Sequence, residues 1–473
     1  MFFGRRNMEN IHEECGVFGY YSETEKSDIA RSVYYGLFAL QHRGQEACGI
    51  AVNKDRVTSC KKGMGLVGDF FNDKMLEEMP GNIAIGHVRY CDAVNNNIEN
   101  AQPLFVKYVK GTLAIAHNGN IFNAVALRKE LENEGALFHS TGDSEIIAYL
   151  IARARLTCPT VEDAVASIIP RLQGSFSLVI MSPSKLIAVR DPFGVRPLCI
   201  GRVGNDYVFS SETCGLDTVG AKFERDVLPG EIVTIHHGQL KSNRQYCKKE
   251  SATCIFEHIY TARPDSVIDG QSVNESRILA GRLLAKQHPV DADIVIGVPD
   301  SGLSSAIGYS KESGIPYGTG LIKNRYIGRT FILPSQAQRE RSVALKLNAL
   351  RHSIDGKRVV MVDDSIVRGT TIANIVKMLK NNGAKEVHVR VASPKFLYAC
   401  YFGTDVPDSK YLACTKYTDE ELCRKIDADT LGFLDVESLP DIVPDSTVGF
   451  CTGCFTGKYP CPVPKKEDKV TFE

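Results

Sequence analysis

Apolar and polar positions follow different patterns in the two halves of the chain. Up to about residue 246, short apolar runs alternate with Gly-rich turns, as in CGVFGY, NIAIGHVRY, GTLAIAHNGN and SFSLVIMSP. Such densely punctuated, strand-like runs predict an α+β domain built largely on antiparallel sheet. Helical periodicity interrupts them at Ile29–Gln41, Ile121–Glu134 and Asp143–Arg153.

The second half contains longer β-branched runs, each followed by a helical pattern. Examples are ADIVIGVPDSGLSSAIGYS and KRVVMVDDSIVRGTTIANIVKMLKNNG, followed by KEVHVRVASP. Fully apolar strands that precede helices predict βαβ units and a parallel sheet. The polar segment 241–252 is the expected linker. The sequence therefore predicts two domains, at 15–246 and 255–473.

Composition narrows the class of protein. The chain has 473 residues, of which 43% are apolar, and its 56 Lys and Arg balance its 56 Asp and Glu. Zero net charge argues against non-specific binding to nucleic acid. No window approaches the ~20 apolar residues of a membrane span, and the N-terminus lacks the apolar core of a secretory signal. We expect a cytoplasmic protein with no nucleic-acid or membrane partner.

Fifteen cysteines are many for such a protein, and a secreted disulfide framework is not expected in a chain of this size. Most of them, such as Cys48, Cys60 and Cys158, are interpreted as inert thiols. A nucleophile or a metal or cluster site is the alternative for a few.

The segment VVMVDDSIVRGTT (359–371) is the most specific motif. A buried strand ends in Asp363 and Asp364, and a Ser/Gly/Thr-rich turn leads into a helix expected to begin near Thr371. The turn and the helix N-terminus suit a phosphate. The two acids suit vicinal hydroxyls or Mg²⁺. The alternative is that the acids only cap the helix.

This motif resembles the phosphoribosyl pyrophosphate (PRPP) signature of the type I phosphoribosyltransferases. In the same resemblance, VPDSG (298–302) is the pyrophosphate loop and the basic segment 323–346 is a loop that closes over PRPP. The resemblance implies one Mg²⁺ per subunit at Ser301, Asp363 and Asp364. It also implies PRPP contacts from Asp363, Asp364, Ser365, Arg368, Gly369, Thr370, Thr371, Lys323 and Arg325. For any one cation of the basic segment, a solvated surface role is the alternative.

In the first half, Cys15 precedes the apolar run GVFGYY. Alone, such a cysteine is most often a core thiol. The segments QHRGQEACGI, GHVRY, AHNGNIFN and STGDSE change this interpretation. Together with Cys15 they resemble the class II glutamine amidotransferases, which are N-terminal-nucleophile (Ntn) hydrolases with an αββα sandwich.

That resemblance implies a role for each of five residues. Removal of the propeptide 1–14 would free the α-amino group of Cys15 as the base for its own thiol. Asn118 and Gly119 would form the oxyanion hole. Arg89 and Asp143 would bind the carboxylate and ammonium of glutamine; taken singly, an ordinary ion pair is the alternative. Cys91 and Asp92 depart from the family's usual Ser-Thr pair.

CTGC (451–454) supplies two thiols, and a tetrahedral centre needs two more. The segments around Cys254 and Cys400 resemble those of the amidophosphoribosyltransferases that hold one [4Fe–4S] cluster per subunit. The resemblance implies the ligands Cys254, Cys400, Cys451 and Cys454. Zinc on the same thiolates is the alternative, and Cys461 is a weaker candidate.

From Cys15 to about Tyr459, the chain resembles the glutamine phosphoribosylpyrophosphate amidotransferases. The resemblance implies that glutamine is hydrolysed at Cys15 and that its ammonia reaches C1 of PRPP through an internal passage. The products are 5-phosphoribosylamine, glutamate and pyrophosphate, in the first step of purine synthesis. It further implies inhibition by purine nucleotides and a homotetramer. The alternatives are an amidotransferase coupled to a sugar-phosphate isomerase, a non-catalytic nucleotide-binding regulator and a salvage phosphoribosyltransferase.

Overall fold

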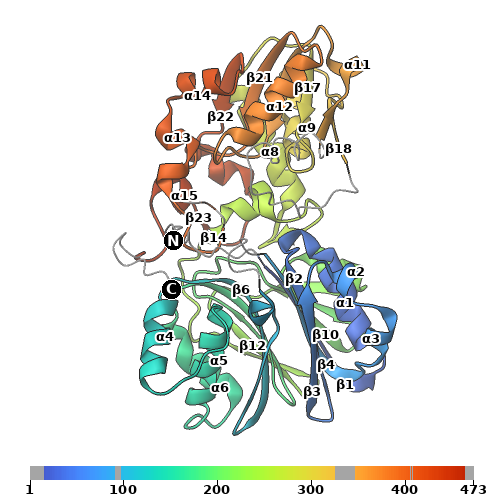
Figure 1. Cartoon of the computed structure of the whole chain (residues 1–473), viewed down its shortest axis with the longest axis vertical. Helices are drawn as coiled ribbons and strands as arrows, with labels where there is room; N and C mark the ends of the chain where they lie inside the picture. The colour runs from blue at the N-terminus through green and yellow to red at the C-terminus, as the bar shows by residue number, and fades with distance from the viewer. Residues whose placement is uncertain (1–14, 91–96, 325–346, 405, 407, 464–473) are drawn as a thin grey trace, which may run out of the picture.

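A computed structural model of the chain describes residues 15–90, 97–324, 347–404, 406 and 408–463. Figure 1 shows two parts stacked along the long axis of the molecule. The N-terminal part, blue to green, contains two sheets with helices outside them. The C-terminal part, yellow to red, contains a smaller sheet covered by helices.

The N-terminal part is built on two antiparallel sheets. The first has the order β11-β9-β10-β1-β4-β2-β3 and the second the order β13-β12-β8-β7-β6-β5. The strands of the first sheet are β1 (Gly16–Lys26), β2 (Ala47–Lys54), β3 (Val57–Met64), β4 (Gly81–Arg89), β9 (Cys199–Val203), β10 (Asp206–Ser210) and β11 (Lys222–Asp226). Those of the second are β5 (Leu104–Tyr108), β6 (Gly111–Ile121), β7 (Gly174–Met181), β8 (Leu186–Arg190), β12 (Ile232–His236) and β13 (Gln239–Asn243).

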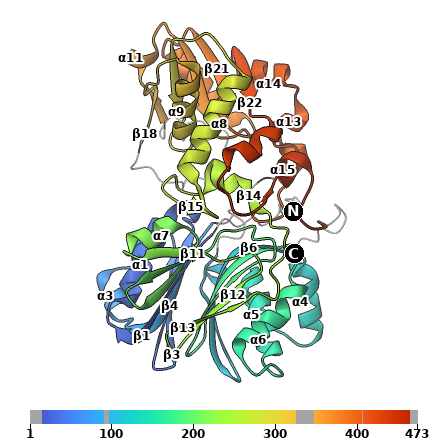
Figure 2. The same cartoon turned by 180° about the vertical axis from the view of Figure 1, so that it is seen from behind.

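Helices cover the outer face of each sheet, as Figures 1 and 2 show from opposite sides. Those beside the first sheet are α1 (Ile29–Ala39), α2 (Val67–Phe70), α3 (Asp73–Glu77) and α7 (Thr213–Thr218). Those beside the second are α4 (Ala124–Asn133), α5 (Asp143–Ala154) and α6 (Val161–Ile168). A third apolar core lies between the sheets. Strands buried on both faces read as continuous apolar runs, and the predicted αββα sandwich is confirmed.

The C-terminal part is built on a parallel sheet of order β17-β20-β21-β22. Its strands are β17 (Ile294–Gly297), β20 (Arg358–Asp363), β21 (Glu386–Val391) and β22 (Thr430–Phe433). Separate apolar cores on its two faces pack against α8 and α9 and against α12 and α14. The helices are α8 (Val273–Gln287), α9 (Gly302–Ser313), α11 (Arg351–Ile354), α12 (Thr370–Asn381), α13 (Ala413–Lys416), α14 (Asp419–Lys425) and α15 (Gly453–Thr456). The predicted parallel α/β domain is confirmed.

Short elements complete the chain. The paired strands are β14 (Thr253–Cys254) with β23 (Phe450–Cys451), β15 (Val267–Ile268) with β16 (Gln271–Ser272), and β18 (Leu321–Lys323) with β19 (Leu347–Ala349). A π-helix spans Glu257–Thr261. The 3₁₀ turns are Gln41–Arg43, Ile98–Asn100, Ile169–Arg171, Ser409–Tyr411 and Val436–Ile442.

Two element boundaries differ from the sequence prediction. The helix expected from Ile121 begins at Ala124, because Ile121 still pairs with β7 and Asn123 bonds the backbone of the 171–173 turn through its side chain. The expected linker 241–252 begins inside β13, whose Lys241, Ser242 and Asn243 pair with β12 at the edge of the sheet. Charged residues are common on edge strands, which explains why the segment resembles a loop.

The two parts meet through a buried ionic network centred on Glu257, the first residue of the π-helix. Its carboxylate accepts hydrogen bonds from Arg43 at 2.6 Å and from Arg196 at 2.9 Å, and all three side chains are at most 1% exposed. Arg43 also pairs with the buried Glu212. Burial opposes ionisation of Glu257, but the two guanidinium groups outweigh it and lower its pKa.

A second set of contacts lies beside this network. The guanidinium of Arg190 binds Asp269 through two hydrogen bonds of 2.7 Å, and the Thr253 hydroxyl donates to the same carboxylate at 2.8 Å. The backbone of 252–254 runs along Phe193 and Val195, to whose carbonyls Ala252 and Cys254 donate. The interface is therefore held by buried charge pairs and by backbone hydrogen bonds.

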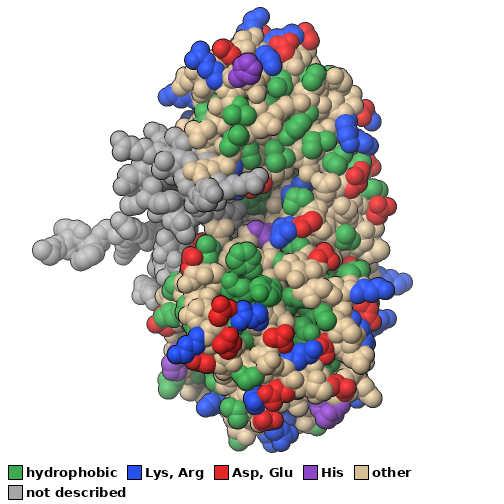
Figure 3. Space-filling model, turned by 90° about the vertical axis from the view of Figure 1, so that its right-hand side faces the viewer, with side chains coloured by type: hydrophobic (Ala, Val, Ile, Leu, Met, Phe, Trp, Pro, Cys, Tyr) green, Lys and Arg blue, Asp and Glu red, His purple; other side chains and the backbone are tan. Residues whose placement is uncertain are grey.

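Basic and acidic side chains are interspersed on the face of the molecule that Figure 3 shows. Their mixture agrees with the equal numbers of the two signs in the sequence. Every helix in the described part of the chain is too short or too polar to cross a membrane.

We predict that Glu257→Ala destabilises the folded chain by about 3–5 kcal/mol, because it leaves two buried guanidinium groups without their carboxylate. The matched control is Glu224→Ala, which removes an exposed partner of Arg202 and costs less than about 1 kcal/mol. Urea unfolding of both variants measures the difference. Equal shifts of the two midpoints would show that the network adds no more than a surface pair.

Candidate functional site

Cys15 immediately precedes β1 and is fully buried. Its backbone nitrogen donates to the side-chain carbonyl of Asn118 at 3.3 Å, across 103 residues of sequence. The segment is anchored two residues later, where the Val17 N–H donates to the Ser211 hydroxyl at 2.9 Å. The structure thus brings together two residues that the sequence predicted to share a site. The predicted propeptide, 1–14, lies outside the described residues.

Asn118 and Gly119 are consecutive residues of β6. The Asn118 side chain is fully buried, and its amide nitrogen has no hydrogen-bond partner among the residues that the structure describes. Gly119 has a φ of 144°, and a Cβ there would lie 2.1 Å from the carbonyl oxygen of Ser175. A buried donor without a partner is costly, so this amide is suited to an acceptor that arrives with a substrate.

Two residues that the sequence analysis missed fix the peptide before Asn118. The N–H of His117 donates to the Gln102 side chain at 2.8 Å, and its carbonyl lies 2.9 Å from Nε2 of the buried His87. Burial lowers the pKa of His87 to about 3, so the ring is neutral and its Nε2–H donates. Gln102 has no local sequence signal, because its partner His117 lies on β6.

The two predicted glutamine ligands lie on elements that flank these residues. Arg89 is the last residue of β4 and is 1% exposed. Asp143 is the first residue of α5 and accepts the N–H of Ile121, three residues after Asn118, at 2.7 Å. Cys91 and Asp92 lie outside the described residues.

In the C-terminal domain, two predicted loops follow the neighbouring parallel strands β17 and β20. The Ser301 hydroxyl donates to Asp364 at 2.5 Å, and Ser365 donates to the other oxygen of the same carboxylate at 2.6 Å. Asp363 and Asp364 are at most 8% exposed. Burial and the adjacent carboxylate raise the pKa of Asp363 well above its usual range. The structure therefore joins the three residues of the predicted magnesium site.

The two loops approach each other closely because Gly302 has no side chain. A Cβ there would lie 2.5 Å from the Val362 carbonyl oxygen. Gly369 has a φ of 81° and ends the turn before α12, which begins at Thr370. Arg368, Thr370 and Thr371 are exposed around the buried acids.

Of the basic segment, Lys323 is described and forms an ion pair with Asp300. Arg325, Arg329, Arg339, Arg341 and Lys346 lie outside the described residues.

The four predicted cluster cysteines meet at the base of the C-terminal domain. Cys254 is paired with Cys451 in the two-stranded sheet β14–β23. Cys400, Cys454 and Cys254 belong to one apolar core, and the four thiols interact electrostatically with one another. Backbone N–H groups point at two of the sulfurs, Phe402 to Cys400 at 3.3 Å and Gly453 to Cys451 at 3.5 Å.

The cysteines that the structure describes are all free thiols. Burial raises the pKa of Cys254 to about 11 and that of Cys48 to about 12, so without a metal both are protonated at neutral pH. Within the described ranges, no group of three or more His, Cys, Asp or Glu side chains is arranged to hold a metal ion.

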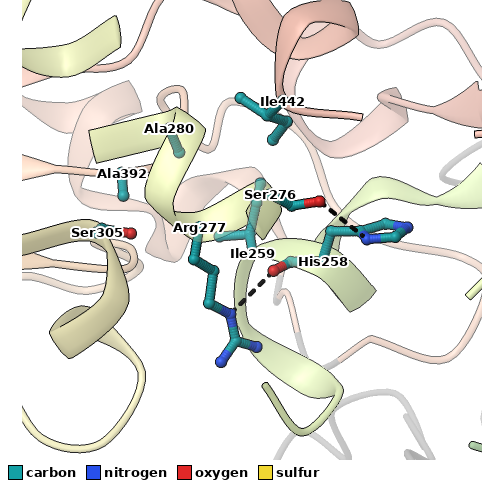
Figure 4. A pocket seen from close by; sticks show the side chains of 8 residues that line it. All are labelled: His258, Ile259, Ser276, Arg277, Ala280, Ser305, Ala392 and Ile442. Atoms are coloured by element: carbon teal, nitrogen blue, oxygen red, sulfur yellow. Dashed lines mark hydrogen bonds between the residues drawn. The ribbon is translucent and has the colours of Figure 1, made fainter. Parts of the chain in front are cut away.

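A narrow cavity lies between α8, α9 and the π-helix (Figure 4). On one side, Ser276 lies 3.4 Å from the ring of His258. On the other, Arg277 donates to the carbonyls of His258, Tyr260 and Ala262 and so caps the end of the π-helix. Arg277 therefore fixes the element that carries Glu257 to the domain interface.

Comparison with known proteins agrees with both halves of this arrangement. A glutamine amidotransferase domain model matches residues 91–218, and a phosphoribosyl transferase domain model matches residues 271–395. The amidophosphoribosyltransferase of Methanocaldococcus jannaschii is 48% identical over 464 residues, which cover 95% of this chain and 98% of that one. The chain belongs to the amidophosphoribosyltransferase family.

Two solved structures agree with this assignment along the whole chain. One, described as the allosteric regulatory enzyme of purine biosynthesis, is 45% identical with a TM-score of 0.89 and covers 96% of this chain and 97% of its own. The other is the glutamine PRPP amidotransferase of Bacillus subtilis complexed with ADP and GMP, which is 45% identical with a TM-score of 0.88 and covers 96% of this chain and 98% of its own.

As an amidophosphoribosyltransferase, the chain is a glutamine-dependent transferase of purine biosynthesis. The prediction of its fold and of its reaction is therefore confirmed. The isomerase-coupled, regulatory and salvage alternatives are excluded. The roles of the individual residues stay predictions.

We predict that Gly119→Ala abolishes the glutamine-dependent reaction, because the added Cβ meets the Ser175 carbonyl and displaces the strand. Gly135→Ala is the matched control: Gly135 also has a positive φ, 92°, but nothing lies within 4 Å of its Cβ position. Both variants carry a backbone cost of about 1–3 kcal/mol. Assays of glutamine hydrolysis separate them, and equal activity in both would exclude a steric constraint at Gly119.

Proposed function

We propose that this amidophosphoribosyltransferase hydrolyses glutamine at Cys15, after removal of residues 1–14, and transfers the ammonia to C1 of PRPP. The observation that carries the proposal is the buried Asn118 amide, which has no partner in the described part of the chain and lies next to Cys15. Its nitrogen is available to an oxyanion formed on the amide carbon that Cys15 attacks.

The chemistry follows from these residues. In the processed chain the α-amino group of Cys15 takes the thiol proton, and the sulfur attacks the side-chain amide carbon of glutamine. The Asn118 amide and the Gly119 N–H stabilise the resulting oxyanion. The intermediate collapses to a thioester and releases ammonia, which leaves with the proton held by the amine. Water then hydrolyses the thioester to glutamate and frees the thiol.

Glutamine is held by groups of opposite charge. Arg89 suits the α-carboxylate, since a guanidinium donates two parallel hydrogen bonds, and Asp143 suits the α-ammonium. Both flank the proposed oxyanion hole, on β4 and α5.

For the second reaction, Asp363 and Asp364 suit the ribose hydroxyls of PRPP, and the turn 365–371 suits its 5′-phosphate. Ser301, Asp363 and Asp364 would hold one Mg²⁺ per subunit. The donor set fits, because these three oxygen-bearing side chains converge on one edge of the sheet. When bound, the ion spreads the charge of the departing pyrophosphate.

We further propose one [4Fe–4S] cluster per subunit at Cys254, Cys400, Cys451 and Cys454. The support is the convergence of four thiols from three distant segments, with backbone N–H groups directed at two of them. Zinc on the same four thiolates is the alternative, which metal and sulfide analysis distinguishes. The bound cluster would cross-link β14, β23 and the segment around Cys400.

Regulation and assembly belong to the same proposal. The 5′-phosphate of a purine nucleotide has the chemistry that the turn 365–371 suits, which supports inhibition of this chain by such nucleotides. A homotetramer and a cytoplasmic location stay predictions from the family resemblance.

We predict that the purified protein lacks residues 1–14 and that Cys15→Ala abolishes glutamine hydrolysis, while synthesis from added ammonia stays within about twofold of the wild type. Intact mass gives the N-terminus, and product assays with glutamine or with ammonium give the two activities. Cys48→Ala is the control, because Cys48 is equally buried and is expected to retain both.

An intact N-terminus together with full glutamine-dependent activity would contradict this mechanism. Loss of both activities in Cys15→Ala would instead indicate that the variant is misfolded.

For the cluster, we predict about four irons and four sulfides per chain in protein purified without oxygen. Cys400→Ser lowers both contents, because a serine hydroxyl is a poor ligand for iron. Cys414→Ser, outside the proposed set, leaves them unchanged. Iron, zinc and sulfide analysis decides the matter: zinc without sulfide would overturn the cluster and leave the enzyme assignment intact.

A further inference from the structure

One buried serine of the amidotransferase domain joins the oxyanion-hole strand to the other domain. Ser175 is the second residue of β7, is fully buried and lies opposite Asn120 on β6. Its hydroxyl oxygen accepts from the Asn120 N–H at 3.3 Å and donates to the Phe402 carbonyl at 2.7 Å. A single hydroxyl therefore connects the peptide that follows Gly119 to the C-terminal domain.

A second contact runs parallel to the first. The Asn120 side-chain amide donates to the Tyr401 carbonyl at 2.8 Å. The ring of Phe122 packs edge-on against that of Phe402, with centroids 6.1 Å apart. Two successive carbonyls of one domain are thus bound by two facing residues of the other.

The Phe402 carbonyl is itself held in place. It also accepts from Nε of Arg196 at 3.2 Å, and the same guanidinium binds Glu257 at 2.9 Å and Thr404 at 3.2 Å. Ser175 therefore bonds an oxygen whose position is set by the ionic network of the interface.

Gly119, which precedes Asn120, needs the support that Ser175 gives to this strand. Gly119 has no side chain to restrict its backbone, and its Cβ position lies 2.1 Å from the Ser175 carbonyl. Oxyanion donors work only when held within about 0.5 Å of the productive geometry. A glycine in this position depends on its neighbours for that accuracy.

We propose that Ser175 is a positioning residue for the oxyanion hole, through which the 401–402 segment of the phosphoribosyltransferase domain holds Asn118 and Gly119 in register. The inference rests on the proposed roles of those two residues. It implies that glutamine is hydrolysed efficiently only when the two domains are docked.

The test is Ser175→Ala. We expect kcat for glutamine hydrolysis to fall about tenfold, while KM for glutamine stays within about twofold, because the loss affects the transition state and not the binding of glutamine. Synthesis from ammonia stays at the wild-type rate. Ser182→Ala is the matched control: Ser182 is buried just after the other end of β7 and keeps wild-type kcat.

Ser175→Cys separates packing from hydrogen bonding, because it keeps the shape of the side chain and has only a weak donor. It is expected to lose kcat as the alanine variant does while melting at the wild-type temperature. Asn120→Ala, which removes the parallel contact, gives the same pattern. Alkylation of Cys15 by iodoacetamide, followed by peptide mass spectrometry, proceeds at the wild-type rate in all variants, because that reaction forms no oxyanion.

Wild-type kcat in both Ser175 variants would overturn the inference. So would an equal loss of the ammonia reaction with a lowered melting temperature, because that pattern marks a packing role alone. Absence of glutamine hydrolysis in the wild-type enzyme would instead overturn the proposed function.

Discussion

One buried carboxylate ties the two domains together at their boundary. Glu257 comes from the C-terminal domain and lies between two arginines of the N-terminal domain, out of contact with water. Charges buried at such a boundary are tolerated only when each is paired with good geometry. The pairing therefore permits one docking of the domains and opposes small displacements from it.

The two candidate sites lie in contrasting surroundings. Cys15, Asn118 and Arg89 are at most 1% exposed, which suits a reaction whose product is lost when it meets water. Around the buried acids of the second half, Arg368 and Thr371 are exposed, which suits a large, highly charged substrate that arrives from solvent. The buried interface lies between these environments.

Sequence alone predicted what is local. The segment 359–371 is one strand, one turn and one helix in succession, so its order in the chain already sets its geometry, and α12 begins one residue from the expected position. The helices α1 and α5 and the order of strands and helices in the second domain were also predicted from periodicity. The predicted start of α4 was wrong because Ile121 pairs with Gly174 of β7, which is far away in the sequence.

The contacts that complete the candidate sites are distant in sequence. The Gln102 side chain accepts from the His117 N–H on β6, and Ser175 contacts Phe402 across 227 residues. Gln102 and Ser175 are ordinary polar residues, and neither belongs to a recognisable motif. Arg43 occurs within a segment that resembles the family, yet its charge and that of Arg196 give no sign that both bind one glutamate. The cysteines were predictable as a set only through that resemblance.

The separation of Ser175 and Phe402 also has a consequence during synthesis. The amidotransferase domain emerges first from the ribosome, and the carbonyls that Asn120 and Ser175 bind follow 227 residues after Ser175, a delay of roughly 10–45 s at ordinary elongation rates. During that interval the first domain can form its strands, but the Tyr401 and Phe402 carbonyls that hold Asn120 and Ser175 are not yet present. On the proposed role of Ser175, a nascent chain consumes little glutamine before the domain that uses the ammonia exists.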